Sequence, residues 1–373
     1  MANKKNVKGN SFTWIQSFAP ESVERVTNGD SLAEPLHVEI HPHHSSTELC
    51  NNSCPGCTGL VYRKQEIGDK GIKPERLIKT IDSFKGKARR VIFSGNCIEP
   101  LMYPDIKEVI KHIRESDVVF YLYSNFYYGN QEGLIEELVN TELDDYARIS
   151  LNAGSNDSYN LVHRPKDTNS FHRIIENGER LARLKTERDS PLFVHVTYLL
   201  NNYNCGKEDL EFAVMWASRN KGINGIRFTT YQKPLGRSMP KMARIPEEDF
   251  LKARDYLHEL KREFDRDDFK VEITNEQVVL QQKIKPFERC YVQEVFAVIG
   301  FDGTVYPCTS MASPSSPEIY KFGNINQENF WDIWERRKRK ANFSLEKCFD
   351  CTRAESEINS GFQGLREQYT SHV

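Results

Sequence analysis

The alternation of strand-like and helix-like segments between residues 36 and 231 is the feature that most constrains the fold. Short runs rich in Val, Ile, Phe and Tyr alternate with stretches whose apolar residues recur at i, i+3, i+4 and i+7. Strands are expected at residues 36–40, 90–94, 118–124, 146–151, 193–200 and 225–231, and helices at 74–85, 104–114, 131–138, 170–184 and 208–220. Because the strands are almost continuously apolar, the pattern predicts an α/β fold with a parallel sheet covered by helices.

A parallel sheet of this size can stay open, as in a Rossmann-type fold, or curl into a partial barrel, and the pattern alone does not choose between the two. In both arrangements ligands bind at the carboxyl ends of the strands. We therefore expect the functional side chains in the loops that follow the strands.

The chain after residue 235 has a different pattern. A long amphipathic helix is expected at 247–264, a hairpin at 296–306 with Asp302-Gly303 as its two-residue turn, and a further helix at 327–340. Three parts are expected. These are an N-terminal extension of residues 1–35, a core domain of residues 36–235, and a linker helix with a small metal-stabilised α+β module in residues 236–373.

Charge and hydropathy exclude several classes of protein. The 51 Lys and Arg residues nearly balance the 53 Asp and Glu residues, so no global positive field favours a nucleic-acid partner. No window approaches the roughly 18 apolar residues of a membrane span, and the basic start lacks the apolar region of a secretory signal. We expect a cytoplasmic protein without a membrane partner. In that reducing compartment, nine cysteines, an odd number, are better explained as metal ligands or catalytic groups than as disulfides.

Three of these cysteines, Cys50, Cys54 and Cys57, lie within eight residues, in the loop after the first expected strand. Three thiolates on a short loop can hold three corners of a cube-shaped [4Fe–4S] cluster and leave the fourth iron open. The alternative is a zinc site with His43 or His44 as its fourth ligand, although a closed zinc site usually pairs ligands across a longer stretch.

The Cys-x3-Cys-x2-Cys spacing after the first strand of a repeating β/α domain resembles the signature of the radical S-adenosylmethionine (SAM) superfamily. Residues 94–105 resemble that family's Gly-rich, Glu-Pro segment after the second strand. Further landmarks fall at successive strand ends, so the resemblance covers about residues 36–235. It implies a partial (β/α)6 TIM-type barrel whose [4Fe–4S] cluster is held by Cys50, Cys54 and Cys57 and binds SAM.

The resemblance also implies a set of SAM contacts: Gly95, Asn96, Glu99, Ser124, Asn125, Ser150, Asn152 and Arg164. Asn96 and Glu99 are alternatives for the contact with the methionine amino group, and Arg164 is either the partner of the SAM carboxylate or a surface arginine. Many relatives carry a bulky or aromatic residue before the last cysteine, near the adenine. Here that residue is Gly56, so another group must fill the space.

The C-terminal region holds a second set of cysteines: Cys290, Cys308, Cys348 and Cys351. Four thiols can ligate either a structural zinc or a [4Fe–4S] cluster. The hairpin with Asp-Gly, the Pro-Cys pair, the Phe-Gly-Asn-Ile segment and the terminal Cys-x2-Cys resemble the SPASM/twitch extension of radical SAM enzymes. With four cysteines, the resemblance implies the shorter twitch form and one closed auxiliary [4Fe–4S] cluster.

Other candidates are isolated residues. Cys97 and Cys205 follow the second and fifth strands, where each is either a small buried hydrophobe or the hydrogen-atom donor of an epimerase. His195 alternates with apolar neighbours on the fifth strand and could face the barrel interior, although a satisfied core histidine is the preferred interpretation. The basic run at residues 336–340 is interpreted as an exposed helix end.

The resemblance implies a radical SAM oxidoreductase. An electron from the first cluster would cleave SAM to a 5′-deoxyadenosyl radical that removes a substrate hydrogen, and the auxiliary cluster would accept an electron. We expect dehydrogenation of a small polar substrate such as a sugar or cyclitol, with an external electron donor such as flavodoxin or ferredoxin. The alternatives are a radical epimerase that uses a cysteine donor, a maturase that modifies a peptide substrate, and a zinc- or iron-binding electron carrier or scaffold without enzymatic activity.

Overall fold

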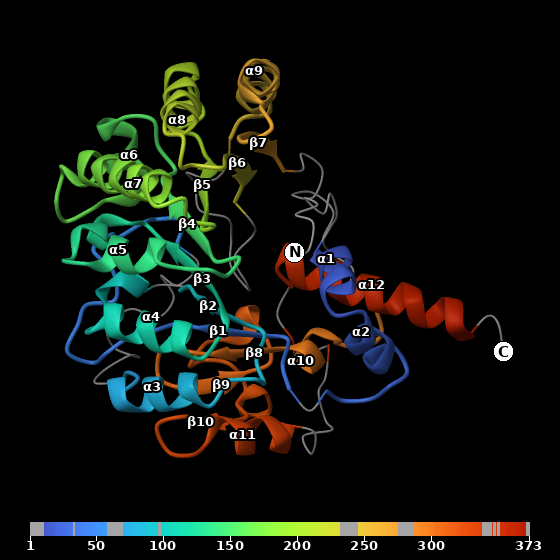
Figure 1. The fold of residues 1–373 in the computed structure, drawn as a ribbon. Coiled ribbons are helices and arrows are strands. Elements are labelled where there is room, and N and C mark those ends of the chain that lie inside the picture. The colour runs from blue at the N-terminus through green and yellow to red at the C-terminus, as the bar shows by residue number, and fades with distance from the viewer. Residues whose placement is uncertain are drawn as a thin grey trace.

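The computed structural model describes residues 11–32, 34–57, 70–95, 98–231, 245–274, 287–337, 345, 348 and 351–370. Across these ranges the strands form one sheet in the order β10-β9-β8-β1-β2-β3-β4-β5-β6-β7. The pairs from β8 and β1 through to β7 are parallel. The sheet ends at β10 and β7 without closing, so the expected α/β fold with a partial barrel is confirmed (Figure 1).

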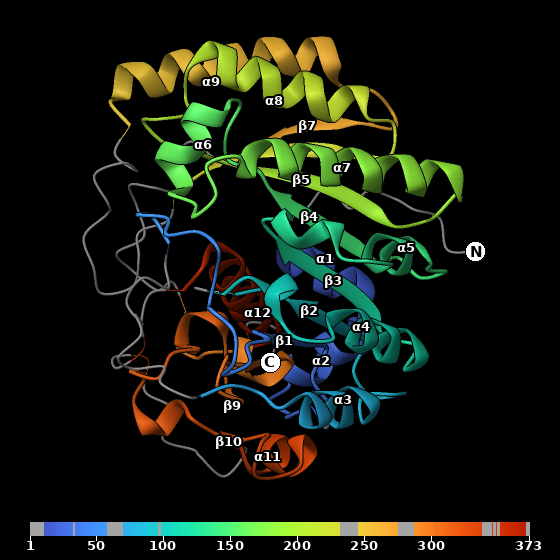
Figure 2. The ribbon, with the colours of Figure 1, turned by 90° about the vertical axis from the view of Figure 1, so that its left-hand side faces the viewer.

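The six expected strands are all present: β1 (His37–Ile40), β2 (Arg90–Phe93), β3 (Val119–Ser124), β4 (Tyr146–Ser150), β5 (Phe193–Leu200) and β6 (Gly225–Thr230). A further parallel strand, β7 (Lys270–Ile273), follows them. The helices that cover the sheet are α3 (Pro74–Asp82), α4 (Ile106–Glu115), α5 (Leu134–Val139), α7 (Ser170–Glu187), α8 (Lys207–Arg219) and α9 (Glu247–Phe264). Figures 1 and 2 show these helices on one side of the sheet.

The main hydrophobic core lies between the sheet and these helices. On β4, Ala147 and Ile149 belong to this core. A Cβ atom added to Gly178 of α7 would lie 3.4 Å from Ile149 Cδ1, which places Ile149 against the helices. Because successive side chains of a strand point to opposite faces, Tyr146 and Arg148 lie on the other side of the sheet. We call that side the inner face.

The predicted hairpin is present, but it is joined to the barrel. Strand β8 (Phe296–Ile299) pairs in parallel with β1, and β9 (Thr304–Tyr306) and β10 (Gly323–Asn324) extend the sheet in antiparallel order. The predicted two-residue turn is wrong, because Gly300 N–H donates to the Thr304 carbonyl (2.8 Å) across a three-residue loop. Gly303 takes the left-handed conformation (φ 83°) that a three-residue hairpin loop requires at its last position.

The N-terminal extension packs against the far end of the chain. Helices α1 (Ser11–Phe18) and α2 (Pro20–Thr27) lie beside α12 (Arg353–Thr370), as Figure 1 shows. The Phe12 ring meets the Phe362 ring edge-on, with 5.0 Å between ring centroids. A Cβ atom on Gly361 would lie 2.1 Å from Phe12 Cγ, so only glycine permits this approach. Phe12 shares a buried cluster with Cys290 and Cys308, so the N-terminal helices support the C-terminal cysteines.

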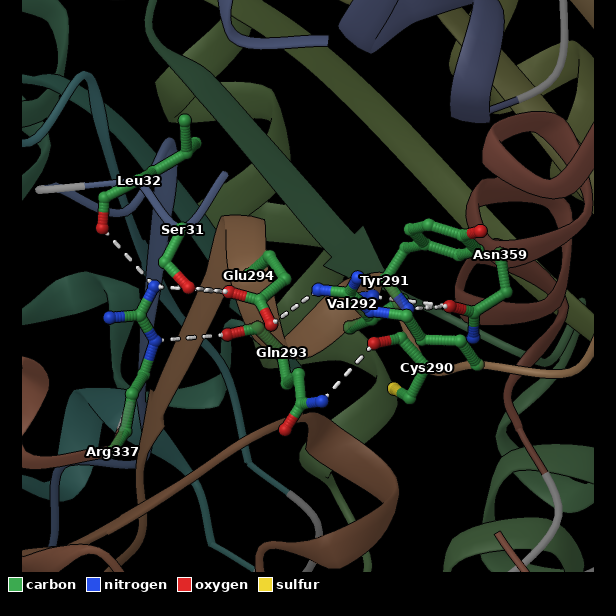
Figure 3. A network of polar contacts seen from close by, with 10 residues as sticks. Ser31, Leu32, Cys290, Tyr291, Val292, Gln293, Glu294, Arg337 and Asn359 are labelled. Atoms are coloured by element: carbon green, nitrogen blue, oxygen red, sulfur yellow. Dashed lines mark hydrogen bonds and ion pairs between the residues drawn. The ribbon is translucent and has the colours of Figure 1, made fainter. Parts of the chain in front are cut away.

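Arg337, the residue after α11 (Phe330–Arg336), is buried, which corrects the expectation of an exposed basic helix terminus at this position. The guanidinium of Arg337 donates to the carbonyls of Leu32 (3.2 Å), Trp334 (2.9 Å) and Gln293 (3.3 Å). It also lies 3.6 Å from Glu294 in the short helix α10 (Val292–Val295). Figure 3 shows how this network joins the N-terminal segment to the segment that carries Cys290. Arg336 of the same run is exposed and pairs with Glu328 (2.6 Å), and residues 338–340 lie outside the described residues.

Within the described ranges, none of the helices combines the length and apolar character that a membrane crossing requires.

Candidate functional site

The loop that carries Cys50, Cys54 and Cys57 follows β1 and is held by helix α6 (Asn156–His163). Ser53 N–H donates to the carbonyls of His163 (2.9 Å) and Arg164 (3.2 Å) at the end of this helix. The Asn52 side chain donates to the Tyr159 hydroxyl (3.1 Å). These contacts fix the three-thiol loop beside the carboxyl ends of the strands, where ligands of such folds bind.

The three sulfurs interact electrostatically. Burial raises the pKa of Cys54 well above its usual range, and the neighbouring Cys57 and Cys50 raise it further. The three cysteines are half-buried, and thiolates gathered away from water need a cation, so the donor set fits an iron–sulfur cluster. In the described part of the chain, no three His, Cys, Asp or Glu side chains converge as ligands of one metal ion do. A cube-shaped cluster gives each thiolate its own iron and does not need that convergence.

The histidine beside the thiols is not one that the sequence suggested. His163 Nδ1 lies 3.1 Å from Cys54 Sγ, and its Nε2 lies 3.3 Å from the Leu151 carbonyl. His43 instead meets the Phe301 ring edge-on, and His44 Nδ1 lies 2.6 Å from Ser46 Oγ. The hydroxyl of Ser155, which caps α6 by accepting from Ser158 N–H, is the signal that could have revealed this helix.

Glu99 connects the segment after β2 to the end of β3. Its carboxylate accepts hydrogen bonds from Ser124 Oγ (2.5 Å), Asn125 N–H (2.9 Å) and Leu101 N–H (3.2 Å). Burial raises the pKa of Glu99 to about 7, although these hydrogen bonds oppose the shift. Asn125 then donates to Asn51 Oδ1 (2.9 Å) in the three-thiol loop. The structure thus brings Glu99, Ser124 and Asn125 together beside that loop, and their contacts with SAM stay a prediction.

The remaining predicted SAM contacts lie around the same strand ends. A Cβ atom on Gly95 would lie 2.2 Å from Ile98 Cγ1, so the turn requires glycine. Asn152 Oδ1 accepts from Leu199 N–H (2.7 Å), which joins β4 to β5. Ser150 pairs with Thr197 in the sheet. Arg164 is exposed and meets the loop through its carbonyl. Asn96 and Cys97 lie outside the described residues.

Tyr231 fills the space beside Gly56. A Cβ atom on Gly56 would lie 2.4 Å from Tyr231 Cε1, so the ring stands directly on the backbone of the three-thiol loop. The ring comes from the residue after β6 and packs with Val162 and Leu199. Burial raises the pKa of Tyr231, and the thiols of Cys54 and Cys57 add to this shift. The resemblance to the radical SAM family implied that another group must fill this space, but not which strand would supply it.

Three thiols of the second set gather in the hydrophobic cluster that includes Ile358 and Phe362 of α12. Cys290 and Cys308 are buried in one cluster, and Cys348 packs against it. Burial raises the pKa of Cys290 to about 12, with further contributions from Cys348 and Glu355. Asn359 of α12 accepts from the N–H groups of Tyr291 (2.6 Å) and Val292 (3.1 Å), as Figure 3 shows, while its Nδ2 lies 3.9 Å from Cys351 Sγ.

The structure places Cys205 away from the inner face. Its side chain packs against the core between the sheet and the helices. Burial raises the pKa of Cys205, and Asp249 of α9 raises it further, which locates the thiol on the helix side. Its role as a hydrogen-atom donor stays a prediction.

Two family sequence models match the chain. That of the radical SAM superfamily matches residues 45–213, and that of SPASM, an iron-sulfur cluster-binding domain, matches residues 290–352. These ranges contain the three-thiol loop and Cys290, Cys308, Cys348 and Cys351. No curated protein matches this chain.

Solved structures share the fold at low sequence identity. SuiB from Streptococcus suis bound to S-adenosylmethionine is similar with a TM-score of 0.60 and 16% identity, over 88% of this chain and 72% of SuiB. SuiB bound to the precursor peptide SuiA has a TM-score of 0.61 and 16% identity, over 96% and 79%. AnSMEcpe with bound AdoMet has a TM-score of 0.56 and 16% identity, over 91% and 100%.

Proposed function

Because this chain belongs to the radical SAM superfamily and carries a SPASM-type iron–sulfur domain, we propose that it removes a substrate hydrogen atom and completes a two-electron oxidation. Cys50, Cys54 and Cys57 would hold the SAM-binding [4Fe–4S] cluster. The auxiliary cluster would be held by Cys290, Cys308, Cys348 and Cys351. The proposal is supported by the gathering of three thiols at the strand ends, and of Cys290, Cys308 and Cys348 in one cluster with Cys351 beside Asn359, because three ligands would leave an iron open and four would close the cluster.

The chemistry that the first cluster supplies is the reductive cleavage of SAM to a 5′-deoxyadenosyl radical, which takes a hydrogen atom from an unactivated C–H bond. The chain supplies the positions of the groups and the exclusion of water. Glu99, through Ser124 and Asn125, holds the end of β3 against the three-thiol loop. Tyr231 packs on the loop from the β6 side. The electron that cleaves SAM would come from a flavodoxin or ferredoxin. After the hydrogen atom is removed, the substrate radical would lose a proton to solvent and its electron to the closed auxiliary cluster.

The substrate we propose is a small polar molecule with an oxidisable C–H bond, such as a sugar or cyclitol derivative. A peptide substrate is the second candidate, because SuiB, which shares the fold over 96% of this chain, was solved with a precursor peptide. An epimerase that uses Cys97 or Cys205 would differ from both candidates by keeping the substrate's redox state.

Turnover under strict anaerobic reduction tests this function. The reconstituted enzyme, dithionite and SAM are incubated with candidate substrates, and 5′-deoxyadenosine and product mass are measured. The expected result is a product that has lost two hydrogens, in step with 5′-deoxyadenosine. A variant with Cys290→Ala and Cys308→Ala should still form 5′-deoxyadenosine while losing the oxidised product. An unchanged product mass would favour epimerisation, and reduced enzyme that yields no 5′-deoxyadenosine would contradict the proposal.

A further inference from the structure

We propose that Arg148, His195 and Thr197 on the inner face of the sheet bind a carboxylate group of the substrate. This inference rests on the proposed function and specifies its substrate class as a carboxylic acid. It starts from side chains that neither the three-thiol loop nor the auxiliary cysteines use.

The sheet register brings the three side chains together. Arg148 of β4 pairs with His195 of β5, and the next inward pair is Ser150 with Thr197. Thr197 in turn pairs with Arg227 of β6. Because residues two apart on a strand share a face and neighbouring strands lie about 4.8 Å apart, these side chains form one contiguous patch.

Each of the three residues has a buried polar atom without a hydrogen-bond partner among the described residues: Arg148 Nε, His195 Nδ1 and Thr197 Oγ1. His195 is 2% exposed and Thr197 is 9% exposed, so water does not readily satisfy these groups. Buried polar groups in native proteins almost always find partners, and leaving one unpaired is unfavourable. Three such groups at adjacent positions indicate a ligand that accepts their hydrogen bonds.

The charges of the patch favour an anion. Arg148 makes no ion pair with any described residue, and its guanidinium lies flat over the Tyr123 ring, 3.5 Å from the centroid. Stacking covers the face of the guanidinium and leaves its N–H edge for a planar oxyanion. The neighbouring Arg227 is already paired with Glu272, with 2.7 Å between Nε and Oε2. Arg148 therefore supplies the cationic charge of this patch.

His195 adds a neutral donor. Burial, together with Arg227 and Arg148, lowers the pKa of His195 to about 3, so the imidazole is neutral near pH 7. A Cβ atom on Gly225 would lie 3.0 Å from Nε2, so that nitrogen faces the backbone of β6. In the Nδ1–H tautomer the ring donates toward the ligand, as the Thr197 hydroxyl does.

One cation with two neutral donors suits a monoanion, which is why we assign a carboxylate and not a phosphate dianion. Arg148 lies two residues before the end of β4, roughly 7 Å along the strand from the ends where the three-thiol loop lies. A carboxylate held there would leave the rest of a small acid pointing toward that loop, which places its C–H bonds where a radical from SAM would form.

The test uses the anaerobically reconstituted, unreduced holoenzyme with SAM, and acetate as the probe. Saturation-transfer NMR follows the acetate methyl signal at constant ionic strength, with inorganic phosphate in a parallel titration. We expect saturable acetate binding that Arg148→Gln weakens about tenfold or more, the loss of one charge-assisted contact. Arg148→Lys keeps the positive charge but loses the paired N–H donors of the guanidinium, so its affinity for acetate should lie between those of wild type and Arg148→Gln. Arg183→Gln, on the exposed side of α7, is the matched control and should bind like the wild type.

Equal acetate binding by wild type and Arg148→Gln, or no saturable binding by folded wild type, would overturn the inference. Phosphate that binds more tightly than acetate would overturn the carboxylate assignment. Near-UV circular dichroism and iron content identify any variant that fails to fold. Because acetate binding is read without turnover, wild type that binds acetate through Arg148 but forms no 5′-deoxyadenosine upholds this site and contradicts the proposed function. Conversely, wild type that forms 5′-deoxyadenosine but does not bind acetate through Arg148 upholds the proposed function and contradicts this site.

Discussion

At the scale of single residues, the site depends on close approaches that only particular side chains permit. Because Gly56 has no side chain, the Tyr231 ring packs directly against the backbone of the three-thiol loop. His163, the last residue of α6, and Asn125, the residue after β3, both reach cysteine sulfurs, at 3.1 Å from Cys54 and 3.8 Å from Cys50. In metal sites, groups that contact the ligands orient those ligands, and His163 and Asn125 would orient the cysteines of a cluster in the same way.

The contact between Gly56 and Tyr231 predicts the effect of a single methyl group. Gly56→Ala should displace the ring or the loop, at about 1–3 kcal/mol, because the new Cβ would lie 2.4 Å from Tyr231 Cε1. We expect Gly56→Ala to bind less iron on reconstitution than wild type. Adding Tyr231→Leu to this variant should partly restore the iron content, because the smaller side chain leaves room for the new methyl group. Gly206→Ala is the control, since the nearest atom to its Cβ lies 3.9 Å away. Iron content equal in Gly56→Ala and wild type would contradict the packing that we describe.

His195 predicts a pH dependence of stability. Its pKa is lowered to about 3 in the folded protein from an ordinary value near 6.5, so the unfolded chain takes up a proton first as the pH falls. Stability is then lost on acidification from about pH 6.5 toward pH 3, by at most about 1.4 kcal/mol per pH unit for this one group. Urea unfolding at pH 7.5, 6.5 and 5.5 should show a smaller acid loss for His195→Gln than for wild type. His172→Gln, an exposed histidine, is the control and should follow the wild type.

At the scale of elements, the predictable parts are those with a strong local pattern. Strands such as β5 were found from their apolar runs, and α4 from the spacing of Ile106, Val109, Ile110 and Ile113, all of which are buried. Strand β7 was missed because its four residues, Lys-Val-Glu-Ile, are too few to stand out after the long helix α9. The pairing of β8 with β1 links residues about 260 positions apart, and no local pattern encodes such a contact.

Helix α12 offers a matched pair of glycines for testing the contact with the N-terminal helices. Gly361→Ala should destabilise the protein by about 1–3 kcal/mol, because its Cβ would overlap the Phe12 ring at 2.1 Å. Gly364→Ala, whose Cβ would meet no atom of the described residues within 4 Å, should be neutral or stabilise by up to about 1 kcal/mol through helix propensity. Urea unfolding measures both. Equal effects of the two substitutions would show that α1 does not pack on α12 in solution.

At the scale of the whole molecule, one sheet carries both sets of cysteines. The three-thiol loop leaves β1, and Cys308 follows β9 in the hairpin that extends the sheet beyond β1. Glu39 of β1 spans the two regions, since its carboxylate accepts from Ser94 Oγ (2.5 Å) and from Thr309 Oγ1 (2.5 Å) beside Cys308. Burial raises the pKa of Glu39, but hydrogen bonds with His41, Ser94 and Thr309 outweigh it and hold the pKa at about 2.

The cysteines themselves were visible in the sequence because their spacing is local, while their surroundings were not. Tyr231, His163 and Asn359 reach the thiols only through the tertiary fold, and each lies in a segment whose local pattern gives no sign of it. The same holds for the inner face. The sequence pattern favours a satisfied core histidine at position 195, whereas in the structure His195 is buried and its Nδ1 has no hydrogen-bond partner among the described residues. Its surroundings are set by the neighbouring strands, which the local pattern does not encode.

The central claim is that the three-thiol loop holds a [4Fe–4S] cluster with an iron open to SAM. Electron paramagnetic resonance of the dithionite-reduced holoenzyme, recorded with and without SAM, tests it most directly when paired with iron analysis. Wild type should carry about eight irons in two clusters and show a spectrum that SAM changes. A variant with Cys50, Cys54 and Cys57 changed to Ala should lose about half of that iron and the whole response to SAM. A wild-type spectrum that SAM leaves unchanged, or reconstituted protein that holds zinc in place of iron, would contradict the claim.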